Sequence, residues 1–345
     1  MNTSTTNKKP DAERHERRMM KAATQDRYGD ADVITISDVP VPEVGDEDVL
    51  LKVHAAGVDP GAWHLMTGKP YLMRLFGVGF TRPKQKTRGS DVSGTVVAVG
   101  ASVTEFAVGD EVFGVATGSF AEYAVSKERW LVRKSASVSF EEAATIATSA
   151  VTALQALRNG KLEEGQRVLV IGASGGVGSF AVQLAKSMGA TVTAVCSTRN
   201  IERVRALGAD EVIDYTTQTL EATAHDFDLV LDIAGSRSVS VLRRMLAERG
   251  ALVLVGGEGG GNILGAVTRN LTIAAQAPFV KQRLLGMFAM VRKDDLEVLR
   301  RHVEAGALRP LIDTVYPLEA AADALRHVGS NHARGKIVLS VTPSV

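Results

Sequence analysis

Apolar positions in the first third of the chain recur in the short, alternating pattern of half-buried β-strands. Between about residue 20 and residue 134, β-branched runs are separated by Gly, Pro and Asp, which favour turns. One short helix is expected to begin near Pro60. The predicted strands are residues 49–53, 95–99, 111–115 and 120–125. We therefore expect a β-rich first domain.

From about residue 168 the pattern changes to strands that alternate with amphipathic helices. The first strand, 167–171, ends in glycines and is followed by a helix at 178–188. Such alternation predicts a parallel sheet with right-handed crossovers. The later strands are expected at 191–196, 211–213, 229–232, 250–255 and 271–275, and the later helices at 201–207 and 239–247. A last helix (318–327) and strand (335–341) return to one of the two domains, and periodicity alone does not decide which.

A glycine-rich turn joins the strand at 167–171 to its helix. Glycines at such a turn let the backbone approach a pyrophosphate and let the helix pack closely on the strand. Ala173 stands at the usual first glycine of G-x-G-x-x-G, and the strand–turn–helix context favours cofactor binding over a merely tight turn. The candidate cofactor-binding residues are Ala173, Ser174, Gly175, Gly176, Val177 and Gly178.

Other short motifs in this chain match those of unrelated enzyme families. Residues 172–176 also read G-x-S-x-G, the nucleophile elbow of serine hydrolases, but that interpretation leaves Gly175 and Gly178 unexplained. A P-loop is excluded because no lysine follows the glycines. Tyr123 and Lys127 match Y-x-x-x-K of short-chain dehydrogenases, yet they fall in a predicted strand, where four residues span roughly 13 Å.

The end of the second strand of the parallel series indicates which nicotinamide cofactor is bound. NAD-binding versions place an Asp or Glu there to hold the ribose 2′-hydroxyl. Residues 196–200 contain no carboxylate, and instead offer Ser197, Thr198 and the guanidinium of Arg199 to a 2′-phosphate. This predicts NADPH; the alternative is that Arg199 is a surface residue and both cofactors are accepted.

Charge and cysteine content exclude several other classes. Lys+Arg total 40 and Asp+Glu 39, so no global field attracts nucleic acid or an anionic membrane. The longest apolar runs are far shorter than the ~18–20 residues of a membrane span. Cys196 is the single cysteine, so no internal disulfide forms. Residues 1–19 are polar and charged and are expected to form a disordered leader. We expect a cytoplasmic protein without nucleic-acid or membrane partners.

An ordered series of motifs covers almost the whole chain. They are Gly57-Val-Asp-Pro60, Gly89-Ser-Asp-Val-Ser-Gly94, Gly109-Asp-Glu-Val-Phe-Gly114, Phe120-Ala-Glu-Tyr123 and Gly172 to Gly178. The series resembles the medium-chain dehydrogenase/reductases, in the zinc-free quinone oxidoreductase branch that includes ζ-crystallin. The resemblance implies an α/β fold in which a Rossmann doubly wound parallel sheet (151–277) is inserted in a GroES-like β-rich domain (20–150, completed by 278–345). It also implies a homodimer joined through the cofactor domains.

The chain departs from the zinc-binding branch of that family at the metal ligands. Asp59 stands where those enzymes have a cysteine ligand, and Ser90 and Asp91 stand where they have His-Glu. The four-cysteine structural lobe is also missing, so no tetrahedral nitrogen and sulfur site is expected. Without that Lewis acid, we expect hydride delivery from NADPH to an already electron-poor quinone or α,β-unsaturated carbonyl compound.

The same resemblance implies roles for individual residues. Asp59 and His64 would lie on the substrate side, and His64 is the better candidate for proton delivery, although it could simply pack beside Trp63. Related quinone reductases commonly carry Asn and Tyr at these two positions. The remaining implied cofactor contacts are Thr152, Val255, Gly256 and Gly257 near the nicotinamide, and Tyr215 near the 2′-phosphate.

Two other functions and one segment stay open. A zinc-free alcohol dehydrogenase or carbonyl reductase is the second enzymatic possibility, and a low-turnover NADPH-binding sensor is the non-enzymatic one. Residues 69–88 combine apolar side chains with six Lys/Arg. They form either a lid over the acceptor or a long loop packed on the domain surface.

Overall fold

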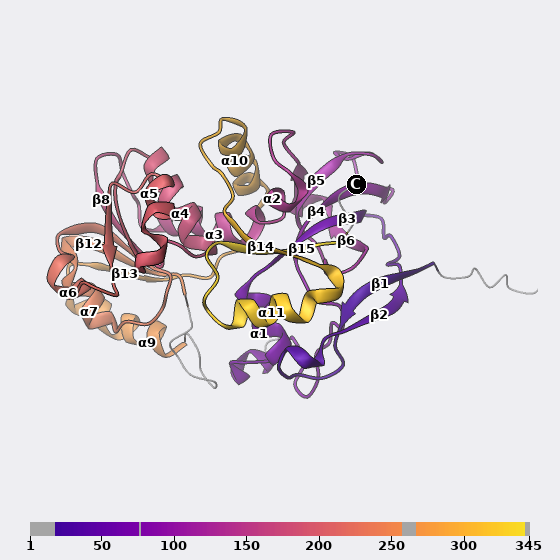
Figure 1. Ribbon diagram of the computed structural model, residues 1–345, viewed down its shortest axis with the longest axis horizontal. Coiled ribbons are helices and arrows are strands. Elements are labelled where there is room, and N and C mark those ends of the chain that lie inside the picture. The colour runs from indigo at the N-terminus through magenta and orange to yellow at the C-terminus, as the bar shows by residue number, and fades with distance from the viewer. Residues whose placement is uncertain (1–17, 76, 257–266, 342–345) are drawn as a thin grey trace, which may run out of the picture.

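The computed structural model describes residues 18–75, 77–256 and 267–341 (Figure 1). Two lobes lie side by side along the longest axis, and each has its own large sheet. Residues 1–17 of the expected leader lie outside the described residues. The first strand begins at Met19, next to the expected boundary.

The β-rich lobe is formed by the first third of the chain, as the alternating pattern predicts. Its α1 begins at Pro60, where the sequence placed a helix start. The strands are β1 (Met19–Thr24), β2 (Thr35–Pro40), β3 (Asp48–Val58), β4 (Asp91–Val99), β5 (Glu111–Val115), β6 (Tyr123–Lys127) and β7 (Leu131–Arg133), and the helices are α1 (Pro60–Thr67) and α2 (Phe140–Ala143). Tyr123 and Lys127 are the two ends of β6, so they do not share a helix face.

The C-terminal segment returns to this lobe. Strand β15 (Lys336–Ser340) pairs antiparallel with β3, and β14 (Ile312–Pro317) pairs parallel with β15. Between them, η7 (Leu318–Ala320) and α11 (Ala321–Gly329) replace the predicted helix at 318–327, and α11 packs against α1. In Figure 1 these yellow elements lie among the indigo and purple strands. The pairing of β15 with β3 therefore shows that the last helix and strand belong to the β-rich lobe, which periodicity alone did not decide.

The second lobe is a doubly wound parallel sheet. Its strand order is β10-β9-β8-β11-β12-β13, and every neighbouring pair is parallel. This is the Rossmann order, and its topological switch point lies between β8 and β11. The strands are β8 (Arg167–Ile171), β9 (Thr191–Cys196), β10 (Glu211–Asp214), β11 (Phe227–Asp232), β12 (Leu246–Leu254) and β13 (Arg283–Gly286), and the helices are α3 (Ile146–Asn159), α4 (Gly176–Ser187), α5 (Ile201–Ala206), α6 (Leu220–Thr223), α7 (Val239–Arg244), α9 (Val267–Gln276) and α10 (Lys293–Glu304). The predicted fold class is confirmed.

Strand β8 shows why both faces of this sheet need helices. Val168 and Val170 belong to a core that includes α3, α4 and α10. Their neighbours Leu169 and Ile171 belong to a second core with α7 and α9. Because successive side chains of a strand point to opposite faces, a continuous apolar run is buried on both sides.

Two details of the predicted series were wrong. Residues 271–275 form part of helix α9, in which Ile273 is buried whereas Leu271 is exposed. This one-sided burial follows the helical period, which a five-residue apolar run does not reveal. The sheet also continues past the expected domain boundary at 277, because β13 pairs with β12.

Candidate active site

The glycine turn between β8 and α4 combines tight packing with open backbone. A methyl group on Gly178 would lie 2.1 Å from the carbonyl oxygen of Gly172, so only glycine lets α4 pack this close to β8. On Gly175 it would meet only that same oxygen, at 3.5 Å. Gly175 is also the N-cap of α4 and offers no side chain to its amides. These uncapped amides and the open side of Gly175 fit an anionic ligand.

The other residues predicted at this turn differ in exposure. Ala173 is buried, while Ser174, Gly176 and Val177 are partly exposed. Asn200, which the sequence analysis did not single out, donates from Nδ2 to Ser174 Oγ (3.1 Å) and Ser197 Oγ (3.2 Å). Its Oδ1 is buried without a hydrogen-bond partner among the described residues. A buried orphan acceptor between two predicted contact residues fits a polar ligand there.

The predicted 2′-phosphate residues lie together at the ends of β9 and β10. Arg199 and Tyr215 are exposed and Ser197 is half-buried. Residues 196–200 contain no carboxylate, as the sequence shows, but strand pairing sets Asp214 of β10 opposite Cys196. Sequence reasoning missed Asp214 since it examined only the residues that follow β9.

Asp214 is held by hydroxyl groups. Thr198 Oγ1 donates to its Oδ2 at 2.5 Å, and Thr216 Oγ1 donates to Oδ1 at 2.7 Å. These hydrogen bonds, that of Thr198 first, lower the pKa of Asp214 below its usual value. The carboxylate therefore stays ionised, and it orders the turn that carries Arg199.

A buried ion pair lies where the two lobes meet. Lys336, the first residue of β15, and Asp91, the first of β4, are both almost fully buried, with Nζ 3.4 Å from Oδ2. Thr148 on α3 donates to the other oxygen of Asp91. This distance is longer than the about 2.7–2.9 Å that is typical of a strong charge-assisted hydrogen bond.

The same pair touches the glycine turn. A methyl group on Gly176 would lie 3.0 Å from Cδ of Lys336, so the lysine stem runs beside the start of α4. Burial raises the pKa of Asp91 to about 6, against the opposing effect of Lys336, and the nearby Asp59 adds to the rise. At neutral pH Asp91 is largely ionised and Lys336 brings a buried positive charge to the predicted pyrophosphate site. Sequence reasoning missed Lys336, which is 160 positions from Gly176 in a strand that only tertiary structure brings here.

Asp59 and His64 stand at opposite ends of α1. Asp59 is buried and caps the helix, because its Oδ1 accepts from the amide of Ala62 at 3.0 Å. Gly57, two residues before it, packs against Asp91, because a methyl group on Gly57 would lie 3.2 Å from Asp91 Oδ2. His64 Nδ1 donates to the carbonyl oxygen of Lys69 at 2.8 Å, and its ring meets Trp63 edge to face. Since a carbonyl only accepts, this bond puts a hydrogen on Nδ1.

The predicted nicotinamide contacts lie on α3 and after β12. Thr152 Oγ1 donates to the carbonyl oxygen of Thr148 at 2.7 Å and is partly exposed. Val255 and Gly256 follow β12, and a methyl group on Gly256 would lie 2.0 Å from the carbonyl oxygen of Ile233. Gly257 lies outside the described residues. The backbone of this turn thus packs directly on the segment that follows β11, at the carboxyl edge of the sheet.

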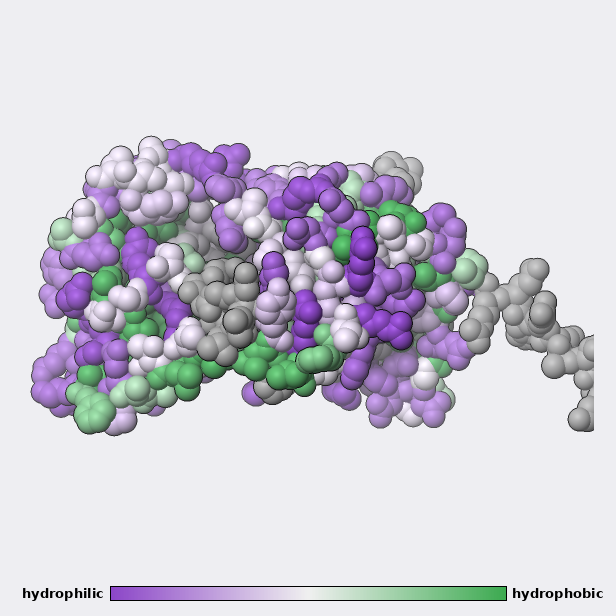
Figure 2. All heavy atoms as spheres, turned by 90° about the horizontal axis from the view of Figure 1, so that it is seen from below, coloured by the Kyte–Doolittle hydropathy of each residue, from purple (hydrophilic) through white to green (hydrophobic). Residues whose placement is uncertain are grey.

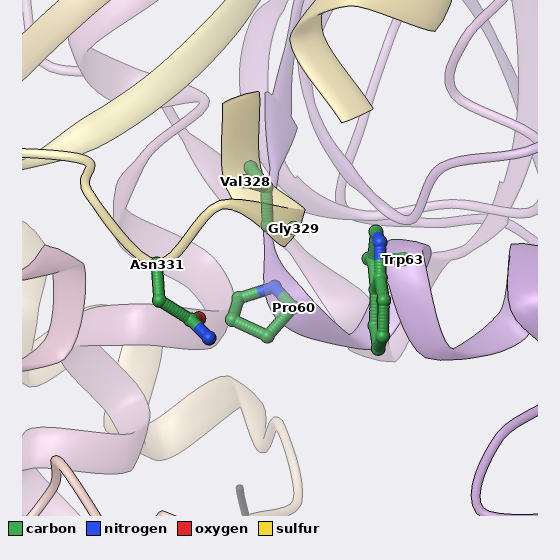
Figure 3. A pocket seen from close by; sticks show the side chains of 5 residues that line it. All are labelled: Pro60, Trp63, Val328, Gly329 and Asn331. Atoms are coloured by element: carbon green, nitrogen blue, oxygen red, sulfur yellow. The ribbon is translucent and has the colours of Figure 1, made fainter. Parts of the chain in front are cut away.

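A shallow hollow opens beside the start of α1. It is lined by Pro60 and Trp63 of α1 and by residues at the end of α11. In Figure 3 the side chain of Asn331 points towards Pro60, and Trp63 stands to the right of Gly329. Both apolar side chains and polar groups line the hollow, among them the amide of Asn331.

The segment 69–88 is attached to the lobe through Tyr28 and Arg74. The Tyr28 hydroxyl donates to the carbonyl oxygens of Val78 (3.0 Å) and Gly79 (2.7 Å), and the Arg74 guanidinium stacks on the Tyr28 ring at 4.2 Å. Leu75 and Phe80 remain exposed. These contacts favour the packed surface loop over the lid, and Phe76 lies outside the described residues.

Within residues 18–75, 77–256 and 267–341, no three His, Cys, Asp or Glu side chains gather as a metal site would require. Over the same ranges, no helix is long and apolar enough to cross a membrane.

Known proteins resemble this chain along nearly its whole length. Residues 45–136 match the alcohol dehydrogenase GroES-like domain, and residues 207–339 match the zinc-binding dehydrogenase domain. The chain is 34% identical over 340 residues to the chloroplast envelope quinone oxidoreductase homolog of Arabidopsis thaliana, covering 93% of this chain and 98% of that protein. It is 32% identical to the chloroplastic NADPH-dependent alkenal/one oxidoreductase of the same plant, covering 94% and 80%.

A solved structure has the same architecture. The quinone oxidoreductase from Coxiella burnetii superposes with a TM-score of 0.82 at 30% identity, covering 94% of this chain and all of that one. Fold, site and relatives define an oxidoreductase that uses a nicotinamide cofactor and acts on a small molecule. The chain belongs to the medium-chain dehydrogenase/reductase superfamily, in its quinone oxidoreductase, ζ-crystallin-like branch.

Proposed function

We propose that this protein reduces quinones or α,β-unsaturated carbonyl compounds with NADPH, and that it does so without zinc. The observation that carries the proposal is the juxtaposition at the seam of the lobes. The open glycine turn, the buried Lys336 with its partner Asp91, and the residues that lead into α1 meet there. Relatives named as quinone and alkenal/one oxidoreductases support this choice of acceptor.

The chain's own residues bind, orient and neutralise charge. When bound, NADPH supplies a hydride to an electron-poor double bond. The amides at the start of α4 and the Lys336 ammonium would hold the pyrophosphate, and Ser197 and Arg199 the 2′-phosphate. Reduction of the acceptor leaves negative charge on its oxygen. His64 would stabilise or protonate that oxygen from Nε2 when its ring is an imidazolium, since Nδ1–H is already bonded to Lys69.

His64→Ala is expected to lower kcat/KM about 10²-fold or more, the lower range for loss of a general acid. Asp59→Asn is the matched variant, because asparagine keeps the cap on α1 while the carboxylate charge is lost. It should change kcat/KM much less than His64→Ala does. Both are measured with one good acceptor, under conditions in which hydride transfer limits the rate. Full kcat/KM in a correctly folded His64→Ala variant would mean that positioning alone carries the reaction.

Arg199→Ala is expected to weaken NADPH binding about 10- to 150-fold, the effect of one charge-assisted hydrogen bond of about 1.5–3 kcal/mol. NADH affinity should barely change, since NADH lacks the 2′-phosphate. Arg205→Ala, which removes another exposed arginine of the next helix, controls for general charge loss. Equal losses for NADPH and NADH would show that Arg199 does not contact the 2′-phosphate.

We also propose a homodimer joined through β13. This strand ends the order of the six-stranded sheet, so its outer edge is open in the described part of the chain. Phe279 and Phe288, which flank it, are 87% and 91% exposed. In Figure 2, green apolar atoms line one margin of this lobe. An open edge beside exposed aromatic side chains suits pairing with a second copy.

Light scattering should give twice the mass of the 36.6 kDa chain. Phe288→Asp should shift that mass towards one chain. A wild-type protein that remains monomeric at micromolar concentration would contradict the dimer. We further propose a cytoplasmic location, which fractionation of the source cells would test.

A further inference from the structure

A buried ion pair at the carboxyl edge of the sheet, separate from the residues discussed so far, links helix α9 to the strand ends. Asp232 is the last residue of β11 and is fully buried. Arg269 lies in the first turn of α9, and its Nη2 donates to Asp232 Oδ2. The arginine side chain is 11% exposed. The pair is therefore held inside the lobe.

Arg269 also binds the backbone of both turns at this edge. Its Nη2 donates to the carbonyl oxygen of Arg237 at 3.0 Å, after β11, and its Nη1 donates to that of Gly256 at 3.4 Å, after β12. One guanidinium thus joins the two turns to each other and to α9. The planar guanidinium has five donors in a fixed fork and can reach these three separate acceptors from two of its nitrogens.

Asp232 completes the connection from the other side. Its Oδ1 accepts from the amide of Gly235 at 3.2 Å, and its carbonyl oxygen accepts from the amides of Val255 (3.0 Å) and Gly256 (3.2 Å). The amides of Ile233 and Ala234, in turn, donate to the carbonyl oxygen of Ile171 beside the glycine turn. These hydrogen bonds fix the positions of the turns after β11 and β12 relative to the glycine turn.

We propose that Arg269, acting through Asp232, is the positioning residue for the nicotinamide half of the cofactor site. The inference rests on the proposed NADPH-dependent function, since in this strand order a dinucleotide extends past the switch point, and β11 and β12 lie on the side away from Arg199. The adenosine half, at β9 and β10, makes no use of Arg269. A defect at Arg269 should therefore affect one half of the ligand only.

The far end of α9 provides a matched control. Arg243 donates to Gln276 Oε1 and Gln282 Oε1, both at 3.0 Å, and so fastens the end of the helix that lies away from the two turns. If Arg269 merely anchors α9, then Arg243→Met should have the same consequences as Arg269→Met. If it positions the turns, only the Arg269 variants should act on the cofactor.

The test compares NADPH with 2′,5′-ADP, which contains the adenosine half without the nicotinamide. Binding is measured by calorimetry for the wild type, Arg269→Met, Arg269→Lys and Arg243→Met. In Arg269→Met, NADPH affinity should fall about 10- to 150-fold, the range of one charge-assisted hydrogen bond of about 1.5–3 kcal/mol. Affinity for 2′,5′-ADP should stay within twofold of the wild type, and Arg243→Met should bind both ligands normally. Arg269→Lys should recover part of the NADPH affinity, because an ammonium keeps the charge but not all three contacts.

A second readout is the fluorescence of bound NADPH, which reports the surroundings of the nicotinamide ring and should change in Arg269→Lys. Asp232→Asn/Arg269→Met avoids a stranded buried carboxylate and replaces Arg269→Met if that variant does not fold. Equal loss of both ligands, unchanged NADPH binding, or the same defect in Arg243→Met would overturn the proposal. Failure of the wild type to bind NADPH would instead overturn the proposed function.

Discussion

Gly178→Ala is expected to destabilise the cofactor lobe and abolish NADPH binding. The new methyl group would lie 2.1 Å from the carbonyl oxygen of Gly172 and 2.7 Å from Cα of Ala173. Both obstacles are backbone, so neither can rotate away. We expect a loss of about 3 kcal/mol or more, the upper range for overpacking. Thermal unfolding should shift down by about 6–12 °C at 2–4 °C per kcal/mol.

Gly175→Ala separates packing from ligand access at the same turn. Its methyl group would meet only one atom, at an ordinary 3.5 Å, so the unfolding temperature should stay close to that of the wild type. NADPH binding should nevertheless weaken, because the methyl group occupies the open side of the turn. If Gly175→Ala binds NADPH as well as the wild type does, the pyrophosphate does not approach this glycine.

Lys336→Met should weaken NADPH and NADH alike, by about 10- to 150-fold for a lost charge-assisted interaction of about 1.5–3 kcal/mol. Both cofactors carry the pyrophosphate, and the lysine stem runs beside Gly176 at the start of α4. This pattern differs from that of Arg199→Ala, which affects NADPH alone. Titration of both cofactors, followed by fluorescence, measures the two affinities.

The single Lys336 variant leaves the Asp91 carboxylate buried without its cation, which costs about 3–5 kcal/mol in comparable cases. Asp91→Asn/Lys336→Met removes that charge and should regain most of the stability but not the cofactor affinity. Recovery of cofactor affinity in the double variant would show that Lys336 acts only by neutralising Asp91.

The pattern of apolar residues predicted most strands and helices of the parallel sheet, because the two-residue period of strands and the 3.6-residue period of helices differ clearly along the chain. The strand at 191–196 was placed to the residue, and the glycine turn was found because strand, turn and helix are adjacent in sequence. The helix at 267–276 was missed because a short apolar run fits the period of a strand as well as that of a helix. Of the large apolar side chains of this helix, only Ile273 is buried.

The candidate site was only half predictable, for a physical reason. Residues such as Arg199 lie on turns whose place follows from local structure. Asp214, Lys336 and Arg269 act through neighbours brought close by strand pairing or by the return of the C-terminal segment. Asn200 was within reach of sequence reasoning, since it follows Arg199 directly. Its hydrogen bonds to Ser174 and Ser197, however, are not visible in the pattern of apolar and polar residues along the sequence.

The most direct test of the account is transfer of deuterium from NADPH labelled at C4 of the nicotinamide, catalysed by protein that has been dialysed against a chelator. Zinc content and acceptor reduction are measured on the same sample. With NADPH deuterated at both C4 positions and an α,β-unsaturated carbonyl compound as acceptor, we predict one carbon-bound deuterium in the product for each NADPH consumed, at a rate that dialysis does not lower and with far less than one zinc per chain. Stoichiometric zinc, with activity lost to the chelator and restored by the metal, would contradict the account.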